Sequence, residues 1–254
     1  MAGNEFSDFI KSIPFLTRYW FCATIILSLS ERLGLISPYW LILDSEAIFY
    51  KFQIWRPLTA LLFFPIRKST AFHFMINLYF MYSYSTRLEN ENFAGRRADY
   101  AFLLAFAWFC LALLGIMFEM PYFMEAMVIA VLYIWCQHNR ETIVQFWFGT
   151  SFKAAYLPWV LLAFDFLVNG QFQGPLFGIL VGHAFYFFNH QYPSEFGGSC
   201  LLKTPAFFYS LFATSGPVQT GFAGPQNFGQ RPSSSTGATL LNRRFPGSGN
   251  RLGD

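Results

Sequence analysis

Six apolar segments follow one another along the chain, and short polar or proline-containing stretches separate them. Their continuous apolar character predicts membrane-spanning helices. The predicted helices cover residues 15–30, 71–84, 100–118, 122–136, 155–168 and 175–188. The pattern therefore predicts an all-α membrane protein, a bundle of six spans within residues 15–190.

Three further segments fall outside these spans. Residues 1–14 carry apolar side chains at helical spacing, which predicts a short helix lying on the membrane surface. Residues 31–69 are too interrupted by prolines and charges to cross a bilayer and too apolar for a free loop, so we expect this long first loop to lie in the interface. Residues 191–254 are predicted to be a cytosolic tail, mostly disordered, because Gly, Ser, Pro, Gln and Asn dominate from about residue 215.

The last apolar segment carries glycines at every fourth position, at Gly174, Gly178 and Gly182. On a helix, this spacing puts all three on one face and leaves a groove without side chains. Another backbone can then approach closely, which is how helices associate within lipid. A soluble helix weakened by glycines, at up to ~1 kcal/mol each, is the alternative. We expect the glycine face either to hold the sixth span against its neighbours or to leave a lateral gate, and the other segments to be built around it.

Composition excludes an ordinary soluble domain. The chain of 254 residues is 54% hydrophobic and 12% charged, whereas a soluble domain has about 25% charged residues. A net charge of +3 does not indicate nucleic-acid binding. The four cysteines are scattered without a CxxC pair, so neither disulfides, a metal site nor a cofactor is predicted.

Charge and length add two expectations about the membrane. Arg96, Arg97, Arg140 and Lys153 lie in loops on the side of both termini, which the positive-inside rule makes cytosolic. Basic residues in the first loop are the exception, and nearby acids partly offset them. The fifth and sixth segments offer ~14 apolar residues, about 21 Å, against roughly 27 Å of hydrocarbon in the endoplasmic reticulum. Such short spans are expected either to be shielded by protein or to thin the bilayer locally.

Trp55 and Arg56 stand in the first loop and suit an interfacial anchor. Together with six spans and a glycine-rich sixth span, they resemble the rhomboid superfamily. Further stretches make the resemblance specific to the derlins, over most of residues 12–193. Among them are Thr17-Arg18-Tyr19-Trp20-Phe21, Phe52-Gln53-Ile54-Trp55-Arg56-Pro57, Tyr84-Ser85-Thr86-Arg87-Leu88-Glu89 and Phe146-Trp147-Phe148-Gly149-Thr150. The chain is similar to metazoan derlins that carry an unfoldase-binding tail.

His73 and Asn77 open the second span and share one helix face. Rhomboid proteases carry a similar pair beside the oxyanion, so this is a vestigial polar pair by resemblance; interhelical hydrogen bonding is the simpler interpretation. A protease also needs Gly-x-Ser-Gly near the fourth span, and that span contains no serine. His183 lies late in the sixth span and is interpreted as packed or interfacial. Glu125 faces either a water-filled cavity or the luminal headgroups. No catalytic residue is predicted.

The C-terminus reads Phe-x-Gly-x-Gly-x-x-Leu over Phe245, Gly247, Gly249 and Leu252. The two apolar side chains can fill pockets, and the glycines let the backbone lie close to a partner. A low-complexity tail is the alternative. The pattern resembles the box by which derlins hold an AAA ATPase unfoldase of the valosin-containing protein type.

The resemblance implies a non-catalytic component of endoplasmic-reticulum-associated degradation. Such a protein engages misfolded luminal and membrane clients, assists their retrotranslocation and recruits the unfoldase. A membrane ubiquitin ligase complex, the bilayer and other copies, in a homo- or hetero-oligomer, are the further implied partners. An active rhomboid-type serine protease and a solute transporter or channel are the rival functions; against the transporter, the spans show no inverted repeat.

Overall fold

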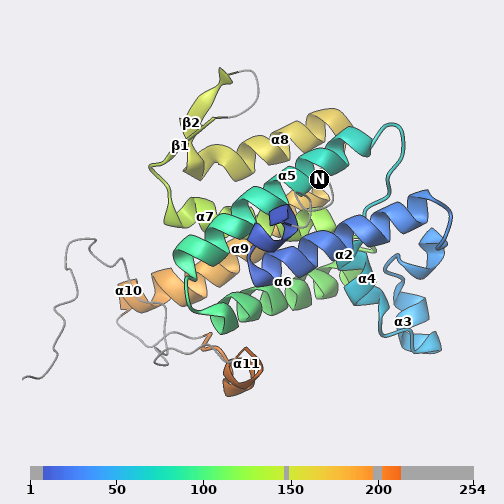
Figure 1. The fold of residues 1–254 in the computed structure, drawn as a ribbon, viewed down its shortest axis with the longest axis horizontal. Helices are drawn as coiled ribbons and strands as arrows, with labels where there is room; N and C mark the ends of the chain where they lie inside the picture. The colour runs from blue at the N-terminus through green and yellow to red at the C-terminus, as the bar shows by residue number, and fades with distance from the viewer. Residues whose placement is uncertain (1–7, 146–148, 197–201, 213–254) are drawn as a thin grey trace, which may run out of the picture. The chain divides into compact units, whose positions relative to one another are not determined.

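The computed structural model describes residues 8–145, 149–196 and 202–212. All of them belong to the first of the chain's two units, which ends at Phe222. Figure 1 shows their arrangement. Most of the predicted tail, including the motif at residues 245–252, lies outside the described residues, as do residues 1–7.

The described residues are mainly helical, as the apolar pattern predicts. The longer helices are α2 (Phe15–Arg32), α5 (Ala71–Arg87), α6 (Arg97–Met117), α7 (Met124–His138), α8 (Leu157–Asn169) and α9 (Gln173–Tyr186). The short ones are α3 (Ser45–Lys51), α4 (Arg56–Leu62), α10 (Tyr192–Phe196) and α11 (Ala206–Leu211), with 3-10 turns at Pro38–Trp40 and Ala154–Tyr156. Single π-helical turns continue α5 over Leu88–Asn92 and α9 over Phe187–Gln191.

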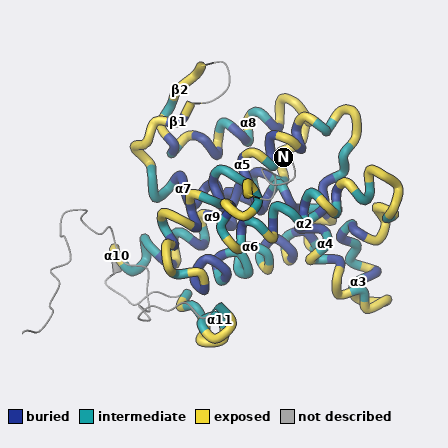
Figure 2. Tube along the Cα trace, viewed as in Figure 1, coloured by how far each residue is buried: buried dark blue, intermediate teal, exposed yellow. Residues whose placement is uncertain are grey.

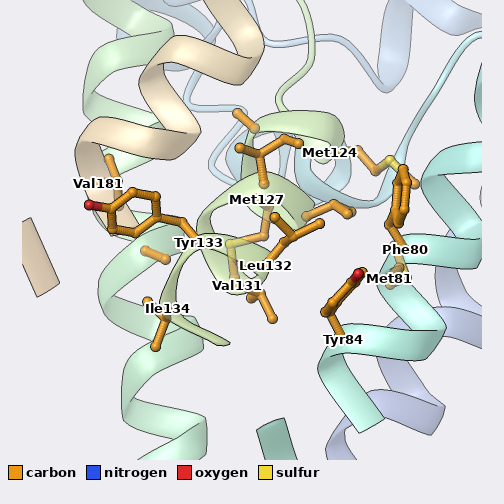
Figure 3. Close-up of a cluster of buried hydrophobic side chains, with 14 of the residues drawn as sticks. Phe80, Met81, Tyr84, Met124, Met127, Val131, Leu132, Tyr133, Ile134 and Val181 are labelled. Atoms are coloured by element: carbon orange, nitrogen blue, oxygen red, sulfur yellow. The ribbon is translucent and has the colours of Figure 1, made fainter. Parts of the chain in front are cut away.

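Helix α7 is the centre of the bundle. Every residue from Ala126 to Cys136 is buried, and α7 contacts α4, α5, α6, α8 and α9. Figures 2 and 3 show this enclosure, with Tyr84 of α5 and Val181 of α9 among the side chains around it. A helix that is apolar on all faces is expected to be buried. The sequence predicts that the bundle is built around the glycine face of α9, and this prediction is wrong. α9 covers one side of α7, and its Leu180 side chain is 52% exposed.

The number of membrane spans stays a prediction. Within the described part of the chain, α6, with 21 residues, is the helix that is long and apolar enough to cross a bilayer by length and composition. The apolar helices Met124–His138 and Ala154–Asn169 are shorter. α2 and α5 have 18 and 17 residues and bury polar groups such as Thr17 and Asn77. The six predicted segments therefore all become helices, most of them shorter than an ordinary span of ~20 residues.

The long first loop is folded onto one end of the bundle. Asp44 caps α3 by accepting from the backbone amides of Glu46 and Ala47. Two backbone bonds join the loop region to the turn before α7: Leu43 N–H donates to Pro121 O at 2.8 Å, and Phe123 N–H donates to Ala60 O at 3.2 Å. The loop also exposes many large apolar side chains, which suits the predicted interfacial position. They include Leu33, Leu35, Tyr39, Trp40, Phe49, Tyr50, Phe52, Ile54 and Trp55.

A small hairpin occupies part of the loop between α7 and α8. Strands β1 (Ile143–Gln145) and β2 (Ser151–Lys153) pair antiparallel, with Val144 opposite Phe152. From the sequence, residues 137–153 between the fourth and fifth predicted spans are expected to form a loop without a hairpin. Lys153 Nζ lies 2.6 Å from Glu141 Oε2 across the base of the hairpin.

Candidate functional site

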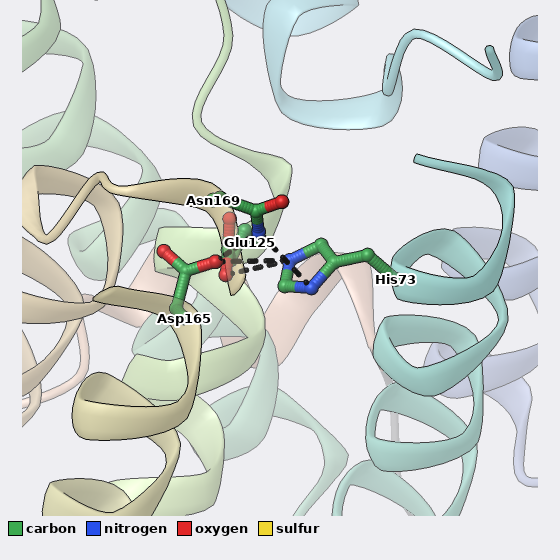
Figure 4. Close-up of polar contacts among 4 residues, drawn as sticks. All are labelled: His73, Glu125, Asp165 and Asn169. Carbon is green, nitrogen blue, oxygen red and sulfur yellow. Dashed lines mark hydrogen bonds and ion pairs between the residues drawn. The ribbon is translucent and has the colours of Figure 1, made fainter. Parts of the chain in front are cut away.

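Four polar side chains meet at one end of the bundle, where α5 and α7 begin and α8 ends (Figure 4). His73 is in the first turn of α5, Glu125 in the first turn of α7, and Asp165 and Asn169 are in the last turns of α8. The predicted topology makes this the luminal end. We call these four residues the luminal polar cluster.

The imidazole of His73 lies at the centre of this cluster. Its Nε2 is 2.9 Å from Glu125 Oε1 and 3.5 Å from Asp165 Oδ1. Asn169 Nδ2 approaches His73 Nδ1 at 3.4 Å and also donates to Asp165 Oδ1. The side chains of His73, Glu125 and Asp165 are 7%, 15% and 4% exposed. Among the described residues, no Lys or Arg lies within 4.0 Å of either carboxylate.

The predicted His73–Asn77 pair does not act as a pair in this geometry. Asn77 is 3% exposed, and its Nδ2 has no hydrogen-bond partner among the described residues. His73 contacts side chains from two other helices, which is the interhelical hydrogen bonding that the sequence analysis gave as the simpler interpretation. One of these partners is Glu125, for which the sequence allowed either a water-filled cavity or the luminal headgroups as surroundings.

Arg56 is fully buried beneath the first loop. Its Nε donates to Gln53 Oε1 at 2.6 Å. Its Nη1 donates to the carbonyl oxygens of Tyr39 and Ile42, both at 2.8 Å. The guanidinium also lies 4.9 Å from the Tyr39 ring centroid. Trp55, the other half of the predicted motif, is 45% exposed. Arg56 therefore holds the loop to the start of α4, while Trp55 remains available to lipid or a partner.

The glycine face of α9 lies along α7. A Cβ built at Gly178 would overlap the carbonyl oxygen of Ala126 and stand 2.9 Å from Ile129 Cβ. At Gly182 it would stand 2.9 Å from Ala130 O. At Gly174 the nearest atom is Glu125 Oε2, at an ordinary 3.7 Å. The close backbone approach is therefore concentrated at the second and third glycines.

His183 of α9 contacts a tyrosine rather than a nucleophile. Tyr133 OH lies 2.9 Å from His183 Nδ1, and their rings meet edge to face. Among the described residues, neither His183 nor His73 hydrogen-bonds a serine or a cysteine. Both imidazoles thus hold helices together in this arrangement.

At the other end of the bundle, Glu89 holds the start of α2. Its carboxylate, 5% exposed, accepts from Leu16 N–H at 3.1 Å, Thr17 N–H at 2.9 Å and Thr17 Oγ1 at 2.8 Å. The first turn of a helix has unpaired amides, and a carboxylate there satisfies them and favours the helix dipole. Thr17 Oγ1 also lies 2.7 Å from Ser85 Oγ, extending the contact to α5.

Replacing Glu89 with alanine is expected to destabilise the bundle by about 3 kcal/mol, because a buried amide, a partly buried amide and a buried hydroxyl lose their acceptor at once. Hydrogen exchange at residues 15–18 measures this directly and should accelerate. The matched control is Glu91→Ala, since Glu91 is exposed two residues further along the chain and should change stability by less than about 0.5 kcal/mol. Equal exchange in the two variants would contradict the role of Glu89.

Asp99 binds the segment that follows the bundle. Its Oδ1 accepts from Thr204 Oγ1 at 2.7 Å and from Tyr209 OH at 2.6 Å, and Oδ2 lies 3.8 Å from Arg96 Nη1. This contact fixes α11 to the start of α6, so the segment after residue 191 is partly structured. Burial, and after it the hydrogen bond to Asp99, raises the pKa of the Tyr209 phenol.

A pair of histidines lies at the same end as Asp99. His138 Nε2 and His190 Nε2 are 2.9 Å apart. Burial and then the nearby charges of His138 and Arg96 lower the pKa of His190 to about 4. Burial, and after it Arg96, also lowers the pKa of His138. The imidazole of His190 is therefore neutral at pH 7.

Three acidic residues that make these contacts were not predicted from the sequence as binding partners: Glu89, Asp99 and Asp165. One signal for Asp165 was available, because it is a lone acid inside an apolar segment, and such residues are functional candidates by default. Glu89 and Asp99 stand in the polar stretch between the second and third predicted spans, where acidic residues are ordinary.

Comparison with known proteins decides the family. Residues 13–206 match the Der1-like family. The chain belongs to this family. Derlin-1 of Homo sapiens is 45% identical over 251 residues, which cover 99% of each chain. Derlin-1 of Caenorhabditis elegans is 46% identical over 207 residues, covering 82% of this chain and 84% of the relative. Derlin-1 of Drosophila melanogaster is 45% identical over 224 residues, covering 88% and 89%. The derlin resemblance is confirmed.

Proposed function

We propose that this Der1-like chain is a non-catalytic component of endoplasmic-reticulum-associated degradation, located in the endoplasmic reticulum membrane. It engages misfolded luminal and membrane proteins and assists their movement to the cytosol. It also recruits an AAA ATPase unfoldase of the valosin-containing protein type, which hydrolyses the ATP. The observation that carries the proposal is the family match over residues 13–206, with Derlin-1 relatives aligned over nearly the whole chain.

A contact-based function fits the surroundings of the histidines. An acyl-transfer mechanism needs a hydroxyl or thiol within hydrogen-bond reach of a base. His73 instead contacts Glu125, and His183 contacts Tyr133. The rival function, an intramembrane serine protease, is tested by incubating the purified protein with a reporter membrane segment in liposomes. Turnover of the reporter would favour the protease.

The proposed action on the bilayer rests on short helices and on the exposed loop. α8 and α9 have 13 and 14 residues. At ~1.5 Å per residue they reach about 20–21 Å, less than the roughly 27 Å of hydrocarbon. We infer that the bilayer thins around this side of the bundle, which lowers the barrier for a client segment. A bilayer of uniform thickness around the protein in nanodiscs would contradict this.

Both termini are proposed to face the cytosol, so that the terminal motif Phe245, Gly247, Gly249 and Leu252 can reach the unfoldase. A membrane ubiquitin ligase complex and further copies of this or a related chain are the proposed partners within the membrane.

Deleting residues 245–254 is expected to abolish co-purification of the unfoldase, because Phe245 and Leu252 supply its apolar anchors. Pull-down from solubilised membranes measures this, and membrane insertion should be unchanged. The matched control deletes residues 224–233, a segment of equal length in the same tail, and should leave pull-down intact. Undiminished pull-down after the terminal deletion would contradict the motif assignment.

A further inference from the structure

We propose that His73, Glu125 and Asp165 bind one divalent first-row transition-metal ion, of the Zn²⁺ class, at the predicted luminal end of the bundle. The site is assembled from the first turns of α5 and α7 and the last turns of α8 (Figure 4). One ligand atom from each residue lies within 4.8 Å of the others. The ion would join three helices that are far apart in sequence.

Charge is the first argument for a cation. When both carboxyl groups are ionised, the cluster retains at least one uncompensated negative charge even with a protonated imidazole. His73 and Asp165 are largely buried, and no Lys or Arg of the described residues lies within 4.0 Å of either acid. Such a charge is costly inside a membrane protein unless it is paired or coordinates a metal. A divalent ion compensates it fully.

Ligand geometry is the second argument. Zn²⁺ binds nitrogen and carboxylate oxygen at about 2.0–2.2 Å, so neighbouring ligand atoms of a tetrahedral site are about 3.3–3.6 Å apart. His73 Nε2 lies 3.5 Å from Asp165 Oδ1, which is within this range. It lies 2.9 Å from Glu125 Oε1, a hydrogen-bond distance that has to lengthen when the ion binds. Imidazole favours Zn²⁺ and its neighbours in the first row over Ca²⁺ or Mg²⁺, which prefer oxygen ligands alone.

The surroundings also suit a metal ligand set. A metal-binding histidine uses one ring nitrogen for the ion, while a second group holds the other. Here Nε2 of His73 faces both acids, and Asn169 Nδ2 lies 3.4 Å from Nδ1. When the ion takes Nε2, the ring proton moves to Nδ1, and the amide of Asn169 has to turn its oxygen toward Nδ1 to accept it. Glu125 is 15% exposed, and Gly174 of α9 approaches its second oxygen without a side chain. This gives the ion an approach on the Glu125 side.

The experiment uses the full-length chain in lipid nanodiscs, purified without a histidine tag, kept reduced and stripped of metal with a chelator. Zn²⁺ alone is the probe, and its affinity and stoichiometry are measured by competition with a chromophoric chelator. The test variant is Glu125→Gln with Asp165→Asn, which keeps side-chain shape and every histidine and cysteine. The control is His138→Gln with His190→Gln, because the Nε2 atoms of this pair are 2.9 Å apart and the two imidazoles are the alternative Zn²⁺ ligands among the described residues.

We expect one equivalent of Zn²⁺ per chain, an affinity reduced at least ~100-fold in the carboxylate variant, and a change of less than about threefold in the histidine control. Co²⁺ in place of Zn²⁺ should give visible d–d absorption without a thiolate charge-transfer band, since no cysteine belongs to the ligand set. This spectrum tests the wild-type protein even if the carboxylate variant fails to fold.

Three results would overturn the proposal: uptake well below one equivalent by the wild-type chain, equal affinity in the carboxylate variant, or a thiolate band with Co²⁺. In the first case, an infrared band from a protonated carboxylic acid that disappears in Asp165→Asn would assign the charge compensation to a proton. Clearance of clients and unfoldase binding are measured separately, so failure here leaves the proposed function standing.

Discussion

Replacing Gly178 with alanine is expected to force α9 away from α7 and to lower the free energy of unfolding by about 3 kcal/mol, the upper end for overpacking. The added methyl group would overlap the carbonyl oxygen of Ala126, and a backbone atom of the buried central helix cannot rotate aside. Thermal unfolding of the purified protein in nanodiscs measures the change, which corresponds to roughly 10 °C in Tm.

Two alanine substitutions on the same helix are the controls. All three gain the same helix propensity, up to ~1 kcal/mol, so only the contact differs. Gly182→Ala should lower the free energy of unfolding by less than Gly178→Ala, because its Cβ would lie 2.9 Å from Ala130 O. Gly174→Ala should leave stability unchanged or raise it, because its Cβ would lie 3.7 Å from Glu125 Oε2. The order Gly178, Gly182, Gly174 is therefore the result to look for. A Gly178→Ala protein as stable as Gly174→Ala would show that α9 does not approach α7 this closely.

Helices could be predicted from the sequence because their signals are local. An apolar run and its end are readable without tertiary contacts, and the predicted segment 122–136 became α7 at Met124–His138. The second segment was predicted to end at Tyr84, but α5 runs to Arg87 and continues through a π-helical turn. The polar residues there looked like a loop, yet Glu89 is buried because it caps α2.

The luminal polar cluster could not be predicted in the same way. His73 and Glu125 are 52 positions apart in the chain, and His73 and Asn169 are 96 apart. No periodicity links such residues, so only the packing of α5, α7 and α8 brings them together. His73 was singled out by resemblance and given Asn77 as its companion, whereas its contacts in the structure come from other helices. The central position of α7 in the bundle was not predicted either, although the sequence shows that this segment is apolar on all faces.

Arg56→Ala is expected to release the first loop from the bundle, at a cost of about 3 kcal/mol in local stability. The substitution removes a fully buried side chain and leaves the carbonyl oxygens of Tyr39 and Ile42 without their donor. Each unsatisfied buried acceptor costs about 1–3 kcal/mol. Hydrogen exchange over residues 39–55 should accelerate by about a hundredfold, since 1.4 kcal/mol is a factor of ten.

The matched control is Arg67→Ala, because Arg67 belongs to the same long loop but is exposed. It should change exchange little, as surface substitutions usually alter stability by less than about 0.5 kcal/mol. The exchange rate in Arg56→Lys should fall between those of the two alanine variants. A lysine ammonium group cannot reach Gln53 and two carbonyl oxygens at once, as the forked guanidinium of Arg56 does. If client clearance depends on a loop held in place, it should fall in the same order. Identical exchange in Arg56→Ala and Arg67→Ala would reduce Arg56 to an ordinary interfacial anchor, and clearance lost only in Trp55→Ala would move the function from the buried arginine to the exposed indole.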